Sequence, residues 1–133
     1  MSIINIVGAK IWGGGEQYVY DICKQLRQRH RTAYILVDQS NEDMQSRYAQ
    51  VGHVMTANLY TLKGFLSVNA VAKQMKGQRI NTIVCHSGKY ILFCIALKQL
   101  TGAKLVFIKH NLVPGKTDMY HRWINAQVDA FVC

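Results

Sequence analysis

Three consecutive glycines, Gly13, Gly14 and Gly15, separate an apolar run from a segment of helical period. Glycine lets a backbone approach a ligand closely, and the first N–H groups of a helix have no partner within it, so such a turn suits a phosphate group. Glu16 follows in the first helical turn, where the helix dipole alone explains an acidic residue. The spacing matches neither G-x-G-x-x-G nor G-x-x-x-x-G-K-[ST], so the standard dinucleotide and P-loop fingerprints are absent. The alternative is a glycine-rich turn that merely starts a helix.

A second candidate is His110, which follows the apolar run 105–108. Its position predicts a loop, where an imidazole can donate a hydrogen bond to a hydroxyl group or a phosphate oxygen. An exposed loop residue without function explains it as well. Lys109 and Lys116 flank it and could supply positive charge to a phosphate.

His86 and Ser87 follow another apolar run, 81–85. Neighbouring strand residues point to opposite faces, so Cys85 cannot pair with His86 as nucleophile and base, and we interpret Cys85 as a core residue. A contact of His86 and Ser87 with a substrate competes with a plain helix cap at Ser87. Trp12, beside the glycines, could stack on a ring of a ligand.

The elements that must position these residues alternate between apolar runs rich in β-branched residues and helical periods. Strands are predicted at 3–7, 33–37, 53–57, 81–85, 105–108 and 130–133, and helices at 16–29, 41–50, 61–75, 89–100 and 118–127. Strands that are apolar throughout indicate an α/β fold with a doubly wound, mostly parallel sheet and helices on both faces, which is Rossmann-like. Ligands bind beyond the carboxyl ends of such strands, so the loops at 8–15, 86–88 and 109–116 should meet at one rim.

The chain is basic, with 16 Lys and Arg against 7 Asp and Glu and a formal charge of +9. Such a charge attracts phosphate-bearing partners. The basic residues gather near predicted helix ends, where cations favour the dipole, and an attraction to anionic lipid headgroups is the alternative. No apolar run approaches the roughly 18 residues that span a bilayer, and no secretion signal precedes the first strand. We therefore place the protein in the cytoplasm. Peripheral contact with the inner face of the membrane is the second option. The two basic groups are Lys24, Arg27, Arg29 and Arg31, and Lys73, Lys76 and Arg79.

The cysteines and histidines show no metal-binding pattern. Cys23, Cys85, Cys94 and Cys133 lie at irregular spacings in apolar segments without a C-x-x-C pair, so we expect buried, reduced thiols. The histidines have no spacing typical of a metal site. We therefore expect no metal and no cofactor.

In their order, these motifs resemble the amino-terminal domain of retaining GT-B glycosyltransferases of the family-4 kind. The likeness covers the whole chain: a first strand, residues 13–17 opening a helix, a strand that ends in Lys109-His110-Asn111, and the segment 129–133. The resemblance implies that Gly13–Gly15 and Glu16 lie beside the donor diphosphate and that His110 lies at the reaction centre. It also implies that loops of this domain hold the acceptor, and the candidates there are Trp12, His86, Ser87, Lys109 and Lys116.

That family also has a second domain, which carries two glutamates spaced E-x(7)-E. This chain has only Glu16 and Glu42, so we expect residues 1–133 to be the acceptor-side half, with the donor-binding C-terminal domain missing and the isolated half inactive. The resemblance implies a hexosyltransferase-type enzyme. It would transfer a sugar from a nucleotide sugar to a glycan or lipid-linked acceptor in cell-surface polysaccharide or glycolipid synthesis.

Three other functions compete with this one. Asp38 lies about 20 residues after the glycines, where an acidic residue holds the ribose in NAD(P)-binding Rossmann domains, and this is the main alternative. A nucleic-acid-binding module has only the charge in its favour. A hydrolase that uses two carboxylates is disfavoured by the scarcity of acidic residues.

Overall fold

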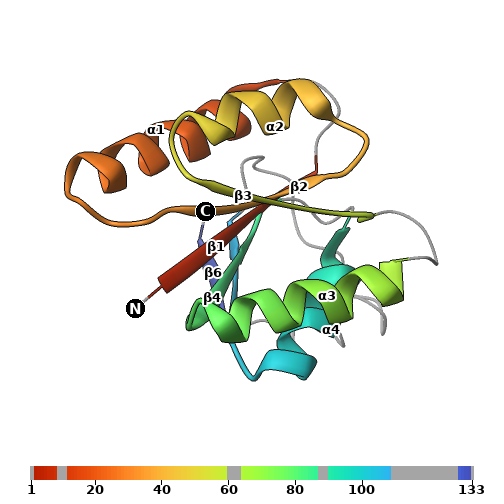
Figure 1. Ribbon diagram of the computed structural model, residues 1–133. Coiled ribbons are helices and arrows are strands. Elements are labelled where there is room, and N and C mark those ends of the chain that lie inside the picture. The colour runs from red at the N-terminus through yellow and green to blue at the C-terminus, as the bar shows by residue number, and fades with distance from the viewer. Residues whose placement is uncertain (1, 9–11, 60–63, 87–89, 109–128, 133) are drawn as a thin grey trace.

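The computed structural model describes residues 2–8, 12–59, 64–86, 90–108 and 129–132, and shows a parallel sheet covered on both faces (Figure 1). Its strands are β1 (Ser2–Val7), β2 (Tyr34–Asp38), β3 (His53–Ala57), β4 (Ile80–Cys85), β5 (Lys104–Ile108) and β6 (Ala130–Val132). Its helices are α1 (Gly14–Gln28), α2 (Glu42–Ala49), α3 (Gly64–Gly77) and α4 (Ile91–Thr101). Every strand pair is parallel. The predicted doubly wound α/β class is confirmed.

The strand order is β3-β2-β1-β4-β5-β6, so the winding direction reverses between β1 and β4. In Figure 1, α1 and α2 cover one face of the sheet, and α3 and α4 cover the other. Doubly wound sheets bind ligands where the order reverses, beyond the carboxyl ends of the strands. In this chain that point follows Val7 of β1 and Cys85 of β4.

Two apolar clusters lie on the two faces of the sheet because strand side chains alternate. Ile4, Ile6 and Leu36 face α3 and α4, whereas Ile35 and Val37 face α1 and α2. The three described cysteines are free and buried, as expected. Burial raises the pKa of Cys23 to about 11 and raises the pKa of Cys94 well above its usual value. These thiols therefore act as core residues.

The predicted boundaries that fall on described residues hold to within two residues. Helix α3 ends at Gly77, two residues beyond the expected end at residue 75. Helix α4 begins at Ile91 after an N-cap at Tyr90, whereas its predicted start is residue 89. Apolar periodicity does not mark helix ends, because end residues are solvated and lie outside the buried stripe. The helix predicted at 118–127 lies outside the described residues.

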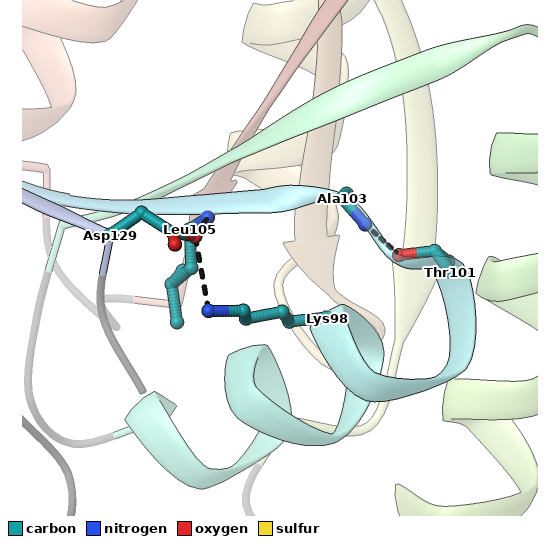
Figure 2. Close-up of polar contacts among 5 residues, drawn as sticks. All are labelled: Lys98, Thr101, Ala103, Leu105 and Asp129. Carbon is teal, nitrogen blue, oxygen red and sulfur yellow. Dashed lines mark hydrogen bonds and ion pairs between the residues drawn. The ribbon is translucent and has the colours of Figure 1, made fainter. Parts of the chain in front are cut away.

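Asp129 joins β6 to β5 and α4 (Figure 2). Its carboxylate accepts a hydrogen bond of 2.8 Å from the N–H of Leu105, and Lys98 Nζ lies 3.0 Å from the same oxygen. The Leu105 hydrogen bond and Lys98 together lower the pKa of Asp129. Thr101 continues this junction by accepting the N–H of Ala103 at 3.2 Å. The short β6 is thus tied to β5 by a side chain as well as by the ladder.

Candidate functional site

The glycine turn lies at the predicted rim and forms the N-terminus of α1. Gly13 is the N-cap in an extended conformation, and the first helical bond runs from Gln17 N–H to the Gly13 carbonyl at 3.0 Å. The N–H groups of Gly14, Gly15 and Glu16 precede that bond, so they belong to the first turn, whose donors have no partner inside the helix. Helix N-termini of this kind attract anions.

Glu16 stabilises the glycine turn through its side chain. Its carboxylate accepts a hydrogen bond of 3.0 Å from the N–H of Gly13, which is one half of a capping box; glycine has no side chain to complete the other half. A methyl group added to Gly13 would lie 3.2 Å from this carboxylate, whereas one added to Gly14 would meet none of the described neighbouring atoms within 4 Å. Packing against the described part of the chain therefore does not require a glycine at position 14.

Trp12 is fixed beside the turn by an aromatic cluster. Its indole N–H donates to Gln17 Oε1 at 3.1 Å, and its ring lies 5.2 Å from the ring of Tyr48 and 5.9 Å from that of Tyr20. The guanidinium of Arg47 lies 4.8 Å from the Trp12 ring centroid, in a cation–π arrangement. Trp12 thus combines packing within the chain with partial exposure at the rim.

Tyr48 anchors the turn from the core. It is fully buried on α2, and its hydroxyl donates to the carbonyl of Glu16 at 2.9 Å. Burial, with a smaller effect from Glu16, raises the pKa of Tyr48 far above its usual value, so the hydroxyl stays a donor. Sequence reasoning missed Tyr48, because a tyrosine on a short helix gives no sign of a partner 32 residues away.

A shallow hollow of about 120 Å³ opens between Trp12 and the start of α2. Asn41, Asp43, Met44 and Arg47 complete its lining. Asn41 caps α2 by accepting the N–H of Met44 at 3.1 Å, which fixes this wall. The hollow offers an indole, a carboxylate and a guanidinium within one space beside the glycine turn, a combination suited to a polar ligand with ring faces.

His86 reaches across the point where the strand order reverses. Its Nε2 lies 3.0 Å from Oδ1 of Asn5, a buried residue of β1. Four residues on, the hydroxyl of Tyr90 donates to the carbonyl of Ile6 at 2.9 Å, so both flanks of the loop after β4 are tied to β1. Asn5 is a second missed residue, and its signal was present: an amide inside an otherwise apolar strand must find a partner.

Asp38 lies at the same rim, but its carboxylate accepts hydrogen bonds from nearby loops of the chain. It is buried, and one carboxylate oxygen accepts the N–H of Leu59 at 3.1 Å while the other accepts the N–H of Ser40 at 3.2 Å and the Ser40 hydroxyl. These bonds fix the loops after β2 and β3. The carboxylate expected to hold a ribose thus serves as a loop cap, which disfavours the dinucleotide alternative.

Several site residues named from the sequence lie outside the described residues: Ser87, Lys109, His110 and Lys116. β5 does end at this rim, because it is parallel to β1 and β4, so the chain leaves Ile108 on the side of the glycine turn. Among the residues that the structure describes, no three His, Cys, Asp or Glu side chains gather as metal ligands. None of the described helices is both long and apolar enough to span a bilayer.

Fold and rim together define a class: a Rossmann-like domain whose first helix begins with a glycine turn at the switch point of the sheet. The model of Glycosyltransferase Family 4 matches residues 12–133, and the chain belongs to that family. The fold is that of the amino-terminal domain of GT-B glycosyltransferases. A comparison with curated protein sequences found no match.

Solved structures with this fold include three whose identity to the chain is low. MurG of Acinetobacter baumannii superposes with a TM-score of 0.71 at 11% identity, over 98% of this chain and 41% of that one. A glycosyltransferase of Rickettsia africae superposes with a TM-score of 0.72 at 16% identity, over 94% of this chain and 33% of that one. HepE of Anabaena, in complex with UDP-glucose, superposes with a TM-score of 0.67 at 18% identity, over 96% of this chain and 34% of that one. The chain thus spans well under half the length of these proteins.

Proposed function

We propose that this chain is the acceptor-side half of a retaining, hexosyltransferase-type glycosyltransferase. The reaction would move a sugar from a nucleotide sugar to a glycan or lipid-linked acceptor in cell-surface polysaccharide or glycolipid synthesis. The observation that carries the proposal is the Family 4 match across residues 12–133, and the glycine turn at the start of α1 supports it as the proposed place for the donor. The donor-binding domain is proposed to follow this half.

The donor diphosphate is proposed to bind at the start of α1. The N–H groups of Gly14 and Gly15 lie in the first turn, and among the described residues nothing lies within 4 Å of a Cβ added at Gly14, which favours the approach of a phosphate to the backbone. Glu16 holds Gly13 in place, which fixes the turn before a donor arrives. The HepE structure contains UDP-glucose, which supports a nucleotide sugar as the donor class.

The remaining rim residues are proposed to serve the reaction centre and the acceptor. His110 would donate a hydrogen bond at the transferred sugar. Lys109, Lys116, Ser87 and His86 would contact the acceptor, and the bond to Asn5 sets the orientation of the His86 ring. Trp12 would form one wall of the acceptor site through the hollow that it shares with Arg47. A reaction without cofactor or metal, and a cytoplasmic location at the membrane surface, stay predictions.

Titration of the 133-residue chain separates this proposal from the dinucleotide alternative. Amide resonances are followed by NMR while UDP, GDP, NADH or NADPH is added. Nucleoside diphosphates should shift the Gly14 and Gly15 amides, with a weak affinity because the donor half is missing. Saturable binding of NADH or NADPH without any response to UDP or GDP would contradict the proposal.

The activity is tested in one polypeptide that joins this chain to a donor-binding domain. Consumption of a panel of UDP-, GDP- and ADP-sugars is measured with His110 intact and with His110→Ala. Loss of a hydrogen-bond donor at the reaction centre should lower kcat about 10²- to 10³-fold. Transfer by the 133-residue chain alone would contradict its assignment as one half.

A further inference from the structure

The edge of the sheet where the strands begin is dense in cations. Each helix runs antiparallel to the strands, so α1, α3 and α4 all end at this edge (left in Figure 1 for α1 and α3). We use the name basic edge for the cationic residues in the last turns of these helices and in the turns and strand after them. They are Arg27, Arg29, Arg31, Lys76, Arg79, Lys98 and Lys104.

Little negative charge balances this edge. Among the described residues there, the one carboxylate is Asp129, and Lys98 neutralises it at 3.0 Å. Arg29, Arg31, Lys76 and Arg79 are exposed and form no ion pair within the described part of the chain. Most of the described acidic side chains lie at the opposite rim instead, at the starts of α1 and α2 and the end of β2.

The helix dipole explains only part of this charge. Its effect falls off within the last turn, so it accounts for Arg27, Lys76 and Lys98. Arg31, Arg79 and Lys104 lie beyond the helix ends, where the dipole gives no comparable reason for a cation.

Backbone strain adds an independent observation. Arg79 has φ 57°, a left-handed conformation that favours glycine, and His30 after α1 has φ 59°. The corresponding position after α4 is Gly102, with φ 71°. The chain thus places a cation at a turn where glycine would fit with less strain.

An exposed apolar side chain lies on the same helix as one of these cations. Leu100, in the last turn of α4, is 45% exposed and close in sequence to Lys98 and Lys104. Cations around an apolar residue suit a lipid interface, where headgroups take the charge and the acyl boundary takes the leucine. Of the exposed large hydrophobic residues in the described part of the chain, none at this edge is aromatic, so a platform for stacking nucleic-acid bases is missing there.

We propose that the basic edge docks on a bilayer that contains anionic lipids. α1 and α3 lie on opposite faces of the sheet, so their cations flank one edge and can contact a single plane together. The strands are five or six residues long between this edge and the rim, except for the shorter β6. At about 3.3 Å per residue, docking would hold the glycine turn roughly 20 Å from the headgroups.

Vesicle binding of the 133-residue chain tests the proposal. Co-sedimentation is measured with phosphatidylcholine vesicles and with vesicles that contain roughly 30% phosphatidylserine, at about 50 mM and about 500 mM salt. The chain should prefer the anionic vesicles and lose most of that binding at the higher salt. Equal binding to both vesicle types would overturn the proposal, as would tighter binding to a random single-stranded oligonucleotide than to anionic vesicles.

Single variants on the two faces locate the surface. Arg31→Gln and Arg79→Gln should each weaken binding about fivefold, the effect of one cation at a charged membrane, and the double variant about twenty-fivefold. Gln39→Glu is the matched control, because it makes the same change in net charge at the rim, more than a Debye length from the edge. A similar loss in Gln39→Glu, or a loss in only one of the two arginine variants, would contradict docking of the whole edge.

Two further variants separate a direct role from a folding defect. Arg79→Gly should lose about fivefold in vesicle affinity while its thermal midpoint stays level or rises, because the left-handed turn suits glycine. Leu100→Gln should remove the part of the binding that persists at the higher salt. Unchanged binding in both variants would overturn the proposal.

Discussion

The two edges of this sheet are built from the same strands and differ in the segments that adjoin them. At the rim, the turn after β1 carries glycines and the loop after β2 carries a polar cap and carboxylates, and α1 and α2 begin there. At the basic edge the helices end and cations accumulate. Parallel winding causes this separation, because every strand exits on one side and every helix returns to the other. The proposed donor site and the proposed docking surface therefore lie at opposite edges of the sheet.

Glycine has a different purpose at each edge, and substitution by alanine shows it. At Gly14, on the rim, an added methyl group would enter open space, whereas one at Gly52, before β3, would lie 2.5 Å from Ile35 Cδ1 and 2.7 Å from the Ala33 carbonyl oxygen. Packing in the described part of the chain thus requires glycine at position 52 but not at position 14, where the donor is proposed to bind.

Of the substitutions that compare the two edges, the largest effect is expected on activity at the rim. In the polypeptide that carries a donor-binding domain, Gly14→Ala should lower kcat/KM by up to about 100-fold. The added methyl group would push the donor diphosphate away from the first turn of α1, and a small displacement of a bound substrate is enough for such a loss. Thermal unfolding should show no loss of stability. Gly77→Ala, also in open space but at the end of α3, is the matched control and should retain full activity.

A stability effect is expected at Gly52. Gly52→Ala should lower the free energy of unfolding by about 1–3 kcal/mol, since the methyl group meets a backbone carbonyl that cannot move aside. Urea titration measures the loss, and donor binding per folded molecule should not change. A variant as stable as the parent would show that β3 can shift away from Ala33.

A smaller effect of opposite sign is expected at Arg79. Arg79→Gly should raise the free energy of unfolding by up to about 1 kcal/mol, because glycine adopts φ 57° without a clash of its side chain. Gly102→Arg, at the equivalent turn after α4, should have the reverse effect. Both changes are read from the urea midpoint, and a loss of stability in Arg79→Gly would show that its side chain supports the fold.

The smallest effect is expected at Asp129, and it depends on pH. The pKa of Asp129 is lowered by its bond from Leu105 and by Lys98, so its contribution to stability is present above the ordinary value of 3.8 and is lost as the pH falls through the lowered value. Asp129→Asn should cost under about 1 kcal/mol at pH 7, since the pair is open to solvent. Thermal midpoints of variant and parent should converge below about pH 3.

Much of this arrangement could be predicted from sequence periodicity. Apolar runs such as 33–37 identified buried parallel strands, and their alternation with helices predicted the doubly wound class and the rim. These signals are local, because burial on both faces leaves its mark on consecutive residues. The order of short motifs also indicated the family, which the match over residues 12–133 confirms.

What only the tertiary structure decided was the partner of each polar side chain. Asp38 has the spacing of a ribose-binding acid, yet its oxygens hold Ser40 and Leu59. Asn5 and His86 are 81 residues apart and meet only because β1 pairs with β4. Hydrogen bonds depend on distances between atoms that the chain brings together by folding, and the sequence alone records residue types and spacing but not those distances.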